Sequence, residues 1–447
     1  MLTCSSSKES VISVWNPSTL SVLATYKDSA SSSLVTCGDR GFLTSQSDRT
    51  QIKTFSWNKQ SSTLKSVVSE RMTAMATTSC DGGLNLFAGS TSGKMYVWDT
   101  SSGVLIRAWD AHFKAVTSLK ISSDNSMLYS AGEDGIVHCW NILKLLGDLE
   151  SAVSPARTYR GHTLPVTDIH LSSSCSNGGS RLFTSSLDQT SRIYDTRSEK
   201  VLFTVSCSSM LKSVTVDPSE HRLYLGGSNG QIFQVDLHVV AAAQTAATIA
   251  ATAAKRGDSD VAYTPIVLKG HKNSVCSLST TMNGDRLISG DESGSILVWD
   301  TRSQQQLRSY DGHKGMGRIT CIHTISKSKF QRTQSKKTLN DTMVPLRKFQ
   351  GVATELQRAP SVVFRFRGDE HVTTTTNKTS NYEDLKMEAA VVSENHNENH
   401  SISVSENDND REVEMLKRKL EETEEELKRW KSASGKLIAA TTKRKRR

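Results

Sequence analysis

The chain has few cysteines, and no two of them lie close together in the sequence. Its 447 residues include eight cysteines, which are scattered and form no C-x-x-C pair. A disulfide framework or a zinc site is therefore not expected, and a reducing compartment is the better interpretation. No stretch approaches the ~20 apolar residues of a membrane span, and residues 1–10 lead into a predicted strand rather than a secretory signal. We expect a soluble intracellular protein without membrane contact.

Signatures of catalysis are also missing. The segment GSTSGKM (89–95) resembles a phosphate-binding loop, but its Gly-Lys pair lies one residue too close to Gly89, and Met95 replaces the required Ser or Thr. It also precedes a predicted strand, so no helix N-terminus would receive the phosphate. His396 and His400 lie four residues apart without further ligands nearby, which favours a solvated polar tract over a metal site. The sequence predicts no enzyme, no cofactor and no metal ion.

What the chain has in abundance is a short repeated unit. The unit consists of a turn, an apolar strand and a closing aromatic residue or its substitute. Seven closing positions are separated by 40, 43, 42, 54, 41 and 64 residues, and they are Trp15, Phe55, Trp98, Trp140, Tyr194, Val235 and Trp299. A period of about 40–45 residues with a Trp-Asp ending is typical of WD repeats. We therefore predict an all-β fold, a seven-bladed WD-repeat β-propeller, and a protein that binds partners.

In WD repeats a His, a Ser or Thr, an Asp and the closing aromatic form a buried hydrogen-bonded chain. The best matches in two successive repeats are His112, Ser130, Asp134 and Trp140, then His162, Thr184, Asp188 and Tyr194. A third chain runs from His271 to Trp299, and we expect it to be incomplete because Ser293 stands where Asp is expected. Each buried hydrogen bond contributes about 1 kcal/mol net, and a half-satisfied chain is costly. The repeats closed by Phe55, Trp98 and Val235 lack the His.

The two ends of the repeat array complement each other. Residues 2–6 fit the second strand of a blade, and no first strand precedes them. After Trp299 come a strand around 305–310 and the apolar segment RITCIHTI (318–325). We predict that 318–325 completes blade one, so that the propeller spans 1–325. Closure of this kind removes exposed sheet edges, which otherwise invite association.

Two insertions interrupt the array. Residues 142–159 lengthen one connection, and 142–150 suit a short helix. Residues 238–264 are rich in alanine, the best helix former, so 239–255 is compatible with a helix. This second segment has little large apolar surface, which favours a flexible or partly helical surface loop. Contact with a partner is the alternative.

Charge is segregated beyond residue 325. Residues 326–367 form a basic extension with ten Lys or Arg and two acids, whereas 368–426 hold seventeen acids and six bases. The low apolar content of 368–410 predicts an acidic disordered linker. The chain ends in a basic tail that suits nuclear import or nonspecific contact with ribosomal RNA. The tail consists of Lys443, Arg444, Lys445, Arg446 and Arg447.

A heptad pattern predicts a coiled-coil helix at 411–438. Its seam includes Val413, Leu416, Leu420, Leu427, Trp430 and Leu437, with Glu and Lys at the flanking positions. Thr423 and Ser434 weaken the seam, and an isolated helix of this length would be marginal in water. Self-association or a partner helix is the favoured interpretation. Docking on the propeller, or fraying, is the alternative.

Four features together resemble one family. They are the ring that starts at its second strand, the Ala-rich insertion before 264–300, the VPLRKFQ segment (344–350) and the terminal heptad helix. This arrangement is similar to the WD-repeat subunit of the nucleolar complex that matures the large ribosomal subunit, and to its plant members in particular. The resemblance covers the whole chain.

The resemblance implies a non-enzymatic scaffold of pre-60S particles. Such a subunit binds a large helical-repeat subunit and supports removal of the second internal transcribed spacer from pre-rRNA. It also helps to recruit a midasin-type AAA ATPase indirectly, and its C-terminal helix pairs two copies as a homodimer. The implied location is the nucleus, in nucleolus and nucleoplasm. We expect proliferating tissue such as a meristem to need the protein most.

One short motif points to a different function. WDTR (299–302) places Trp299, Asp300 and Arg302 in a box that resembles substrate receptors of cullin-four ubiquitin ligases, and YDTR (194–197) half matches. Arg197 and Arg302 would then project from the ring beside the adaptor. The simpler interpretation is that an Arg in this place makes an ion pair with a neighbouring blade.

Overall fold

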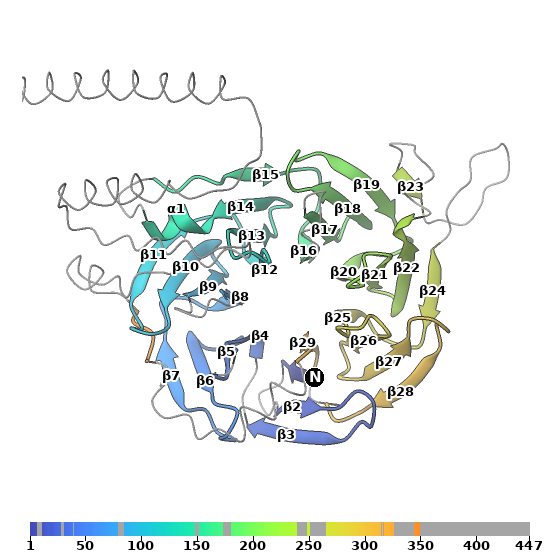
Figure 1. The fold of residues 1–447 in the computed structure, drawn as a ribbon, viewed down its shortest axis with the longest axis horizontal. Helices are drawn as coiled ribbons and strands as arrows, with labels where there is room; N and C mark the ends of the chain where they lie inside the picture. The colour runs from blue at the N-terminus through green and yellow to red at the C-terminus, as the bar shows by residue number, and fades with distance from the viewer. Residues whose placement is uncertain are drawn as a thin grey trace, which may run out of the picture. The chain divides into compact units, whose positions relative to one another are not determined.

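The computed structural model describes residues 1–6, 11–27, 31–38, 40–78, 85–147, 152–172, 180–238, 248–250, 265–313, 315, 317–325 and 344–348. The chain divides into two compact units, Met1–Thr376 and Asn377–Arg447, and every described residue belongs to the first. This first unit contains a ring of seven β-sheets, the blades, around a central axis (Figure 1). The predicted seven-bladed β-propeller is therefore confirmed.

Each blade has four antiparallel strands, which follow one another from the axis outward. Blade one is β29 (Ile319–His323), β1 (Leu2–Ser5), β2 (Val11–Trp15) and β3 (Val22–Lys27). Blade two is β4 (Ser31–Thr36), β5 (Phe42–Gln46), β6 (Gln51–Phe55) and β7 (Leu64–Val67). Blade three is β8 (Met72–Thr77), β9 (Asn85–Ser90), β10 (Lys94–Asp99) and β11 (Leu105–Asp110). Blade four is β12 (Val116–Ile121), β13 (Met127–Gly132), β14 (Val137–Asn141) and β15 (Arg157–Tyr159).

The other three blades follow the same plan, with one extra strand. Blade five is β16 (Val166–Leu171), β17 (Arg181–Ser186), β18 (Thr190–Asp195) and β19 (Val201–Ser206), to which β23 (Thr248–Ala250) adds at the outer edge. Blade six is β20 (Leu211–Val216), β21 (Arg222–Gly227), β22 (Gln231–Asp236) and β24 (Ile266–Lys269). Blade seven is β25 (Val275–Thr280), β26 (Arg286–Asp291), β27 (Ile296–Asp300) and β28 (Gln306–Tyr310).

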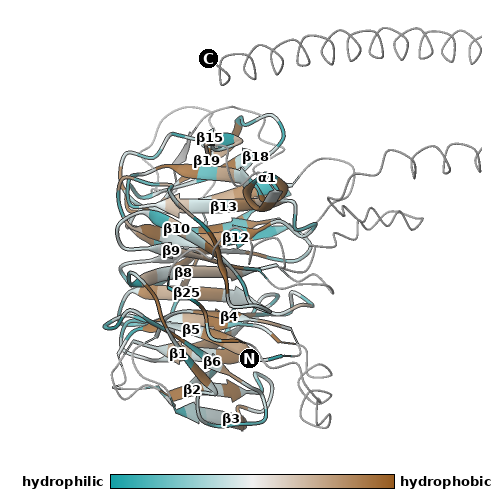
Figure 2. Ribbon diagram, turned by 90° about the vertical axis from the view of Figure 1, so that its left-hand side faces the viewer, coloured by the Kyte–Doolittle hydropathy of each residue, from teal (hydrophilic) through white to brown (hydrophobic). Residues whose placement is uncertain are grey.

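The apolar core lies between the blades. β9 is buried along its whole length because other blades cover both faces of its sheet, whereas the outer strands β3 and β28 are largely exposed. A strand covered on both faces has no solvent-facing side, so its apolar residues, here Leu86, Phe87 and Ala88, need not alternate with polar ones. One core cluster joins Phe87 of blade three to Leu128 and Trp140 of blade four. Figure 2 shows the apolar residues along the stacked strands.

The ring is closed by its C-terminal strand. β29 pairs antiparallel with β1, with Cys321 opposite Cys4, and is the innermost strand of blade one. A backbone bond of 2.9 Å from the amide of Ser6 to the carbonyl of Arg318 extends this pairing. The strand that the sequence predicts at 318–325 therefore lies where it was expected.

The two insertions differ in structure. The first contains α1 (Ile142–Gly147), where Asn141 Oδ1 accepts the amide of Lys144 at 3.2 Å as an N-terminal cap. In the second, β23 pairs parallel with β19, with Ile249 opposite Val205. A helix is therefore the wrong prediction for 248–250, because the open edge of β19 offers backbone groups that only an extended segment can pair.

A short segment from beyond the ring docks on blade three. In the described stretch 344–348, Leu346 is buried in the same apolar cluster as Leu105 and Trp98. The amide of Arg347 donates to the carbonyl of Gly103 at 2.7 Å, and its own carbonyl accepts the indole N–H of Trp98 at 2.9 Å. Ala88, ten residues before Trp98, has no hydroxyl group, so this segment supplies the acceptor for the indole N–H.

Candidate functional site

The hydrogen-bonded chain of blade four is complete. The His112 Nδ1 lies 3.1 Å from the Asp134 Oδ2, and its Nε2 lies 2.8 Å from the Ser130 Oγ. The indole N–H of Trp140 donates to the same Oγ at 3.0 Å. A carboxylate only accepts, so Nδ1 must carry a proton here, and Nε2 accepts from the Ser130 hydroxyl when the ring is neutral. The structure thus brings all four predicted residues together.

In blade five only three of the four predicted residues are joined. The His162 Nδ1 lies 2.9 Å from the Asp188 Oδ2, and its Nε2 lies 2.8 Å from the Thr184 Oγ1. Tyr194 is buried beside them but makes no described hydrogen bond with Thr184, whose hydroxyl lies 3.1 Å from the carbonyl oxygen of Arg192. The prediction for Tyr194 is therefore wrong, because a phenol oxygen at the tip of its ring does not occupy the place of an indole N–H.

The chain of blade seven is complete, contrary to expectation. The His271 Nδ1 lies 3.2 Å from the Asp291 Oδ2, its Nε2 lies 2.6 Å from the Ser289 Oγ, and Trp299 donates to that Oγ at 2.9 Å. Asp291 is the last residue of β26, two positions before Ser293. The corresponding residue of blade four is Gly132, where an added Cβ would lie 2.5 Å from the His112 Nδ1. A carboxylate attached at that position therefore reaches the His directly.

A fourth, partial chain was not predicted from the sequence. The His313 Nε2 lies 2.9 Å from the Thr3 Oγ1, which also accepts the indole N–H of Trp15 at 3.2 Å. Thr3 lies on β1, while His313 comes from the far end of the array, 310 residues later. The Gly312-His313 pair was the signal, but only the ring closure brings it to Trp15. The His313 Nδ1 has no partner among the described residues, and burial lowers the pKa of this imidazole to about 4.

These chains fix loops on one face of the ring. Burial raises the pKa of Asp134, but the hydrogen bond and the charge of His112 outweigh it and hold the pKa below its usual value. The ionised Asp134 also accepts the amide of Phe113 at 3.3 Å, and Asp188 likewise accepts the amide of Thr163 at 3.3 Å. Both amides lie in loops that lead into an innermost strand. The chains therefore hold these loops in position.

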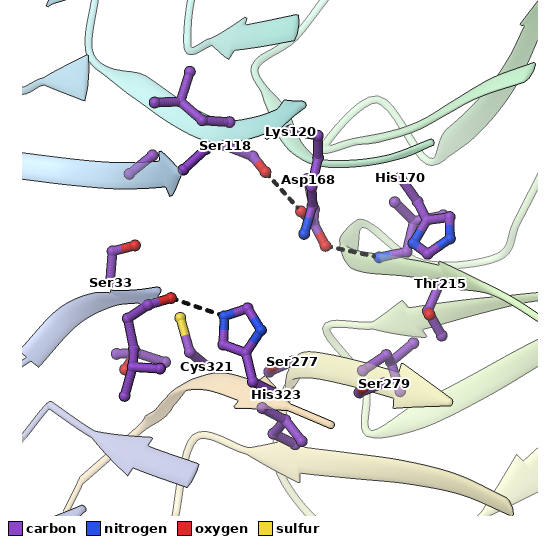
Figure 3. Close-up of a pocket in the computed structure, with 18 of the residues that line it drawn as sticks. Ser33, Ser118, Lys120, Asp168, His170, Thr215, Ser277, Ser279, Cys321 and His323 are labelled. Carbon is purple, nitrogen blue, oxygen red and sulfur yellow. Dashed lines mark hydrogen bonds between the residues drawn. The ribbon is translucent and has the colours of Figure 1, made fainter. Parts of the chain in front are cut away.

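A cavity of about 1150 Å³ runs along the axis, lined by the seven innermost strands. Figure 3 shows Asp168 bridging blades: its carboxylate accepts the Ser118 hydroxyl at 3.0 Å and the amide of Val214 at 3.2 Å. On the opposite wall His323 is bonded to the carbonyl of Leu34 at 2.8 Å. These polar groups thus tie strands together, and the described residues include no group of three side chains suited to a metal ion.

Burial dominates the ionisation of this cavity. Burial and then the charge of Lys120 lower the pKa of His170 to about 3 and that of His323 to about 4. Burial raises the pKa of Asp168, although Lys120 and three hydrogen bonds oppose it. The two imidazoles are therefore neutral at physiological pH and add no positive charge to the cavity.

The residues of the WDxR box lie at the opposite face from Phe113. Trp299 is buried, whereas Asp300 and Arg302 lie at the turn between β27 and β28, where the amide of Arg302 donates to the Asp300 Oδ1 at 3.0 Å. The side chains of Arg302 and Arg197 are both exposed. Neither forms an ion pair with a described residue of another blade. The predicted coiled-coil seam at 411–438 and the basic tail at 443–447 lie outside the described residues.

The ring and its His–hydroxyl–Asp chains define a WD-repeat β-propeller. The family model described as WD domain, G-beta repeat, matches residues 103–141, 153–195 and 263–300. These matches end at the strands that contain Trp140, Tyr194 and Trp299, in the three blades with a linked His, hydroxyl and Asp. No helix among the described residues is long and apolar enough to cross a membrane.

Relatives narrow the class to one family. The chain is 34% identical over 240 residues to WD repeat-containing protein 18 of Rattus norvegicus, covering 52% of this chain and 51% of that protein. It is 30% identical over 307 residues to the Danio rerio protein of the same name, covering 68% and 67%. It is 29% identical over 292 residues to the pre-rRNA-processing protein IPI3 of Yarrowia lipolytica, covering 65% and 66%. The chain belongs to the family of WD repeat-containing protein 18, and its match spans about half the length of the mammalian relatives.

Proposed function

We propose that this protein is a non-enzymatic scaffold for pre-rRNA processing. The observation that carries the proposal is the similarity to relatives named pre-rRNA-processing proteins, in Yarrowia lipolytica, Candida albicans and Caenorhabditis briggsae. The Candida match extends over 386 residues, 77% of this chain. A scaffold also agrees with a ring whose buried polar groups serve to hold blades and loops in place.

The finer parts of the proposal concern the complex and its location. The scaffold joins a pre-60S particle with a helical-repeat subunit, brings a midasin-type AAA ATPase to it indirectly, and supports removal of the second internal transcribed spacer. The basic tail at 443–447 suits import into the nucleus and contact with ribosomal RNA. Nucleolus and nucleoplasm are its expected locations. Dividing tissue makes the most ribosomes, so meristem-like growth is the first process expected to fail without it.

Affinity purification of the tagged full chain tests the assembly. Mass spectrometry of the purified complex should find pre-60S factors, a helical-repeat subunit and the AAA ATPase. Sedimentation should place the chain in large particles as well as in a smaller complex. A chain that migrates alone and purifies without ribosomal precursors would contradict the proposal.

The homodimer rests on the heptad helix and has its own test. Leu420 and Leu427 lie at the centre of the predicted seam, so replacing both with Asp would bury unpaired charges that cost several kcal/mol. Light scattering should then fall from dimer mass to monomer mass, while the melting transition of the propeller stays unchanged. Association with pre-60S particles should weaken through lost bivalency. A double variant that keeps its native mass would show that the helix binds elsewhere.

A second function has one specific observation in its favour. Arg197 and Arg302 are both exposed at equivalent turns of blades five and seven, as a receptor of cullin-four ligases would require. Replacing both with Ala should then remove a cullin and its adaptor from the purified complex but leave pre-60S factors in place. If the complex purified with the wild-type chain contains no cullin, this alternative function is wrong.

A further inference from the structure

One face of the ring displays three bulky apolar side chains. Phe113 is 94% exposed, Leu164 is 48% exposed and Met210 is 45% exposed. Each lies in the loop that leads from the fourth strand of one blade to the innermost strand of the next, namely β12, β16 or β20. These three strands belong to consecutive blades, and strand directions alternate within each blade. The three side chains, which we call the apolar arc, therefore lie on the same face.

Hydrogen bonds tether the loops that carry the apolar arc. In each blade the turn between the second and third strands donates a backbone bond to the loop. These bonds run from Glu133 to Ala115 at 2.9 Å, from Leu187 to Pro165 at 3.1 Å and from Ser228 to Met210 at 2.8 Å. Asp134 holds the amide of Phe113, and the Ser186 hydroxyl donates to the carbonyl of Leu164 at 3.1 Å. The backbone of each loop is thus held in place before any partner arrives, which lowers the entropic cost of binding.

An exposed aromatic residue on a tethered loop, with aliphatic residues on the loops of the next two blades, is typical of a binding anchor. Bulky apolar side chains at a protein surface gain most when a partner covers them and excludes water. The arc also borders the mouth of the axial cavity, because Ala115, Leu187 and Lys212 line that cavity. A partner segment can therefore contact all three loops across the mouth.

The surrounding charge is mainly basic. Lys114, Arg160 and Lys272 are exposed in the loops of blades four, five and seven. Two exposed acids near the arc have basic partners: Glu292 pairs with Lys212 at 3.7 Å and Asp110 pairs with Lys94 at 4.0 Å. Glu133 is a further exposed acid next to the arc. A partner with negative charge is favoured by this distribution. Leu164 and Met210 offer no planar ring on which a base could stack, which favours an acidic protein over RNA.

We propose that the apolar arc, Phe113, Leu164 and Met210, docks an acidic segment of a partner protein that carries two or three bulky apolar side chains. The tethered loops present the arc to the bulky apolar side chains of that segment, and the basic rim selects its charge. Docking at the arc does not require the proposed role in pre-rRNA processing.

Selection from a phage-displayed library of random 16-residue peptides tests the proposal on the full chain. The arc variant is Phe113→Ser, Leu164→Ser and Met210→Ser together. The matched control replaces Val22, Leu23 and Leu307 with Ser; these are 46%, 46% and 47% exposed and lie on outer strands. Both variants change exposed side chains, so circular dichroism and melting temperature should match those of the wild type.

The expected result is enrichment of acidic peptides with spaced aromatic or aliphatic residues. In fluorescence polarisation the best peptide should lose at least tenfold in affinity for the arc variant and less than twofold for the control. Lys114→Glu with Lys272→Glu should also weaken it several-fold. Enriched peptides that bind the arc variant equally well, or an absence of enrichment, would overturn the proposal. A different result would also overturn it: no peptide binds, a 20-nucleotide single-stranded RNA does, and the arc variant loses affinity for that RNA.

Discussion

Asp291 allows a sharp test of how blade seven completes its buried hydrogen-bonded chain although Ser293 replaces the usual Asp. The carboxylate accepts the His271 Nδ1 at 3.2 Å, the amide of Ser293 at 3.0 Å and the amide of Ser295 at 2.8 Å. Asp291→Ala leaves these three donors without their acceptor. A buried donor left unsatisfied costs about 1–3 kcal/mol, and water reaches the turn amides in part, so we expect a loss of about 3 kcal/mol. For a ring of this size that corresponds to a fall of about 5 °C in melting temperature.

A second variant tests whether the carboxylate can act from the position that it has in blade four. Asp291→Gly combined with Ser293→Asp recreates the spacing of Gly132 and Asp134 in blade four. Differential scanning fluorimetry should show that this double variant recovers more than half of the stability that Asp291→Gly alone loses. Asp300→Ala, at an exposed turn, is the control and should change the melting temperature by less than about 1 °C. An Asp291→Ala variant that melts within about 1 °C of the wild type, or a double variant that recovers nothing, would refute this role of Asp291.

Three further predictions follow from the described contacts. An added Cβ at Gly103 would lie 2.3 Å from the Pro345 carbonyl oxygen. Gly103→Ala should therefore release 344–348 and speed hydrogen exchange in that segment. Gly147→Ala is the control, because an added Cβ there meets nothing within 4 Å. Truncation at residue 310 removes β29 and should leave an open, aggregating ring, whereas truncation at about 370 should stay monodisperse by light scattering apart from lost pairing. The lowered pKa values of His170 and His323, about 3 and 4, mean that the unfolded chain takes up protons first as pH falls below about 6.5. Stability should therefore be full above pH 6.5 and decline towards pH 4, and His170→Gln with His323→Gln should flatten that decline in melting curves.

The fold was readable from the sequence because the repeat encodes it locally. Each unit places an apolar strand and a closing aromatic at the same spacing, and only a ring of such units buries both faces of its sheets. The closing strand could also be predicted, since RITCIHTI is apolar and the first blade lacks one strand. In this region the pattern and the packing agree, and β29 pairs with β1.

The hydrogen-bonded chains were readable only in part. Asp291 was missed because a side chain attached at another backbone position can deliver the same carboxylate to His271, and spacing alone does not reveal this. His313 was missed because its partners Thr3 and Trp15 lie at the other end of the chain. Trp98 takes its acceptor from Arg347, 249 residues later, which no local pattern encodes. The apolar arc could not be predicted either, because the sequence does not distinguish an exposed Phe113 from a buried apolar residue.

The most direct test of the central claim is the fate of pre-rRNA after depletion of the protein. Northern hybridisation with a probe for the second internal transcribed spacer should show precursors that retain it accumulating within one or two cell doublings, together with a fall in mature large subunits. Expression of the wild-type chain should restore processing, and truncation at residue 310 should not. Unchanged precursor levels after complete depletion would contradict a role in pre-rRNA processing.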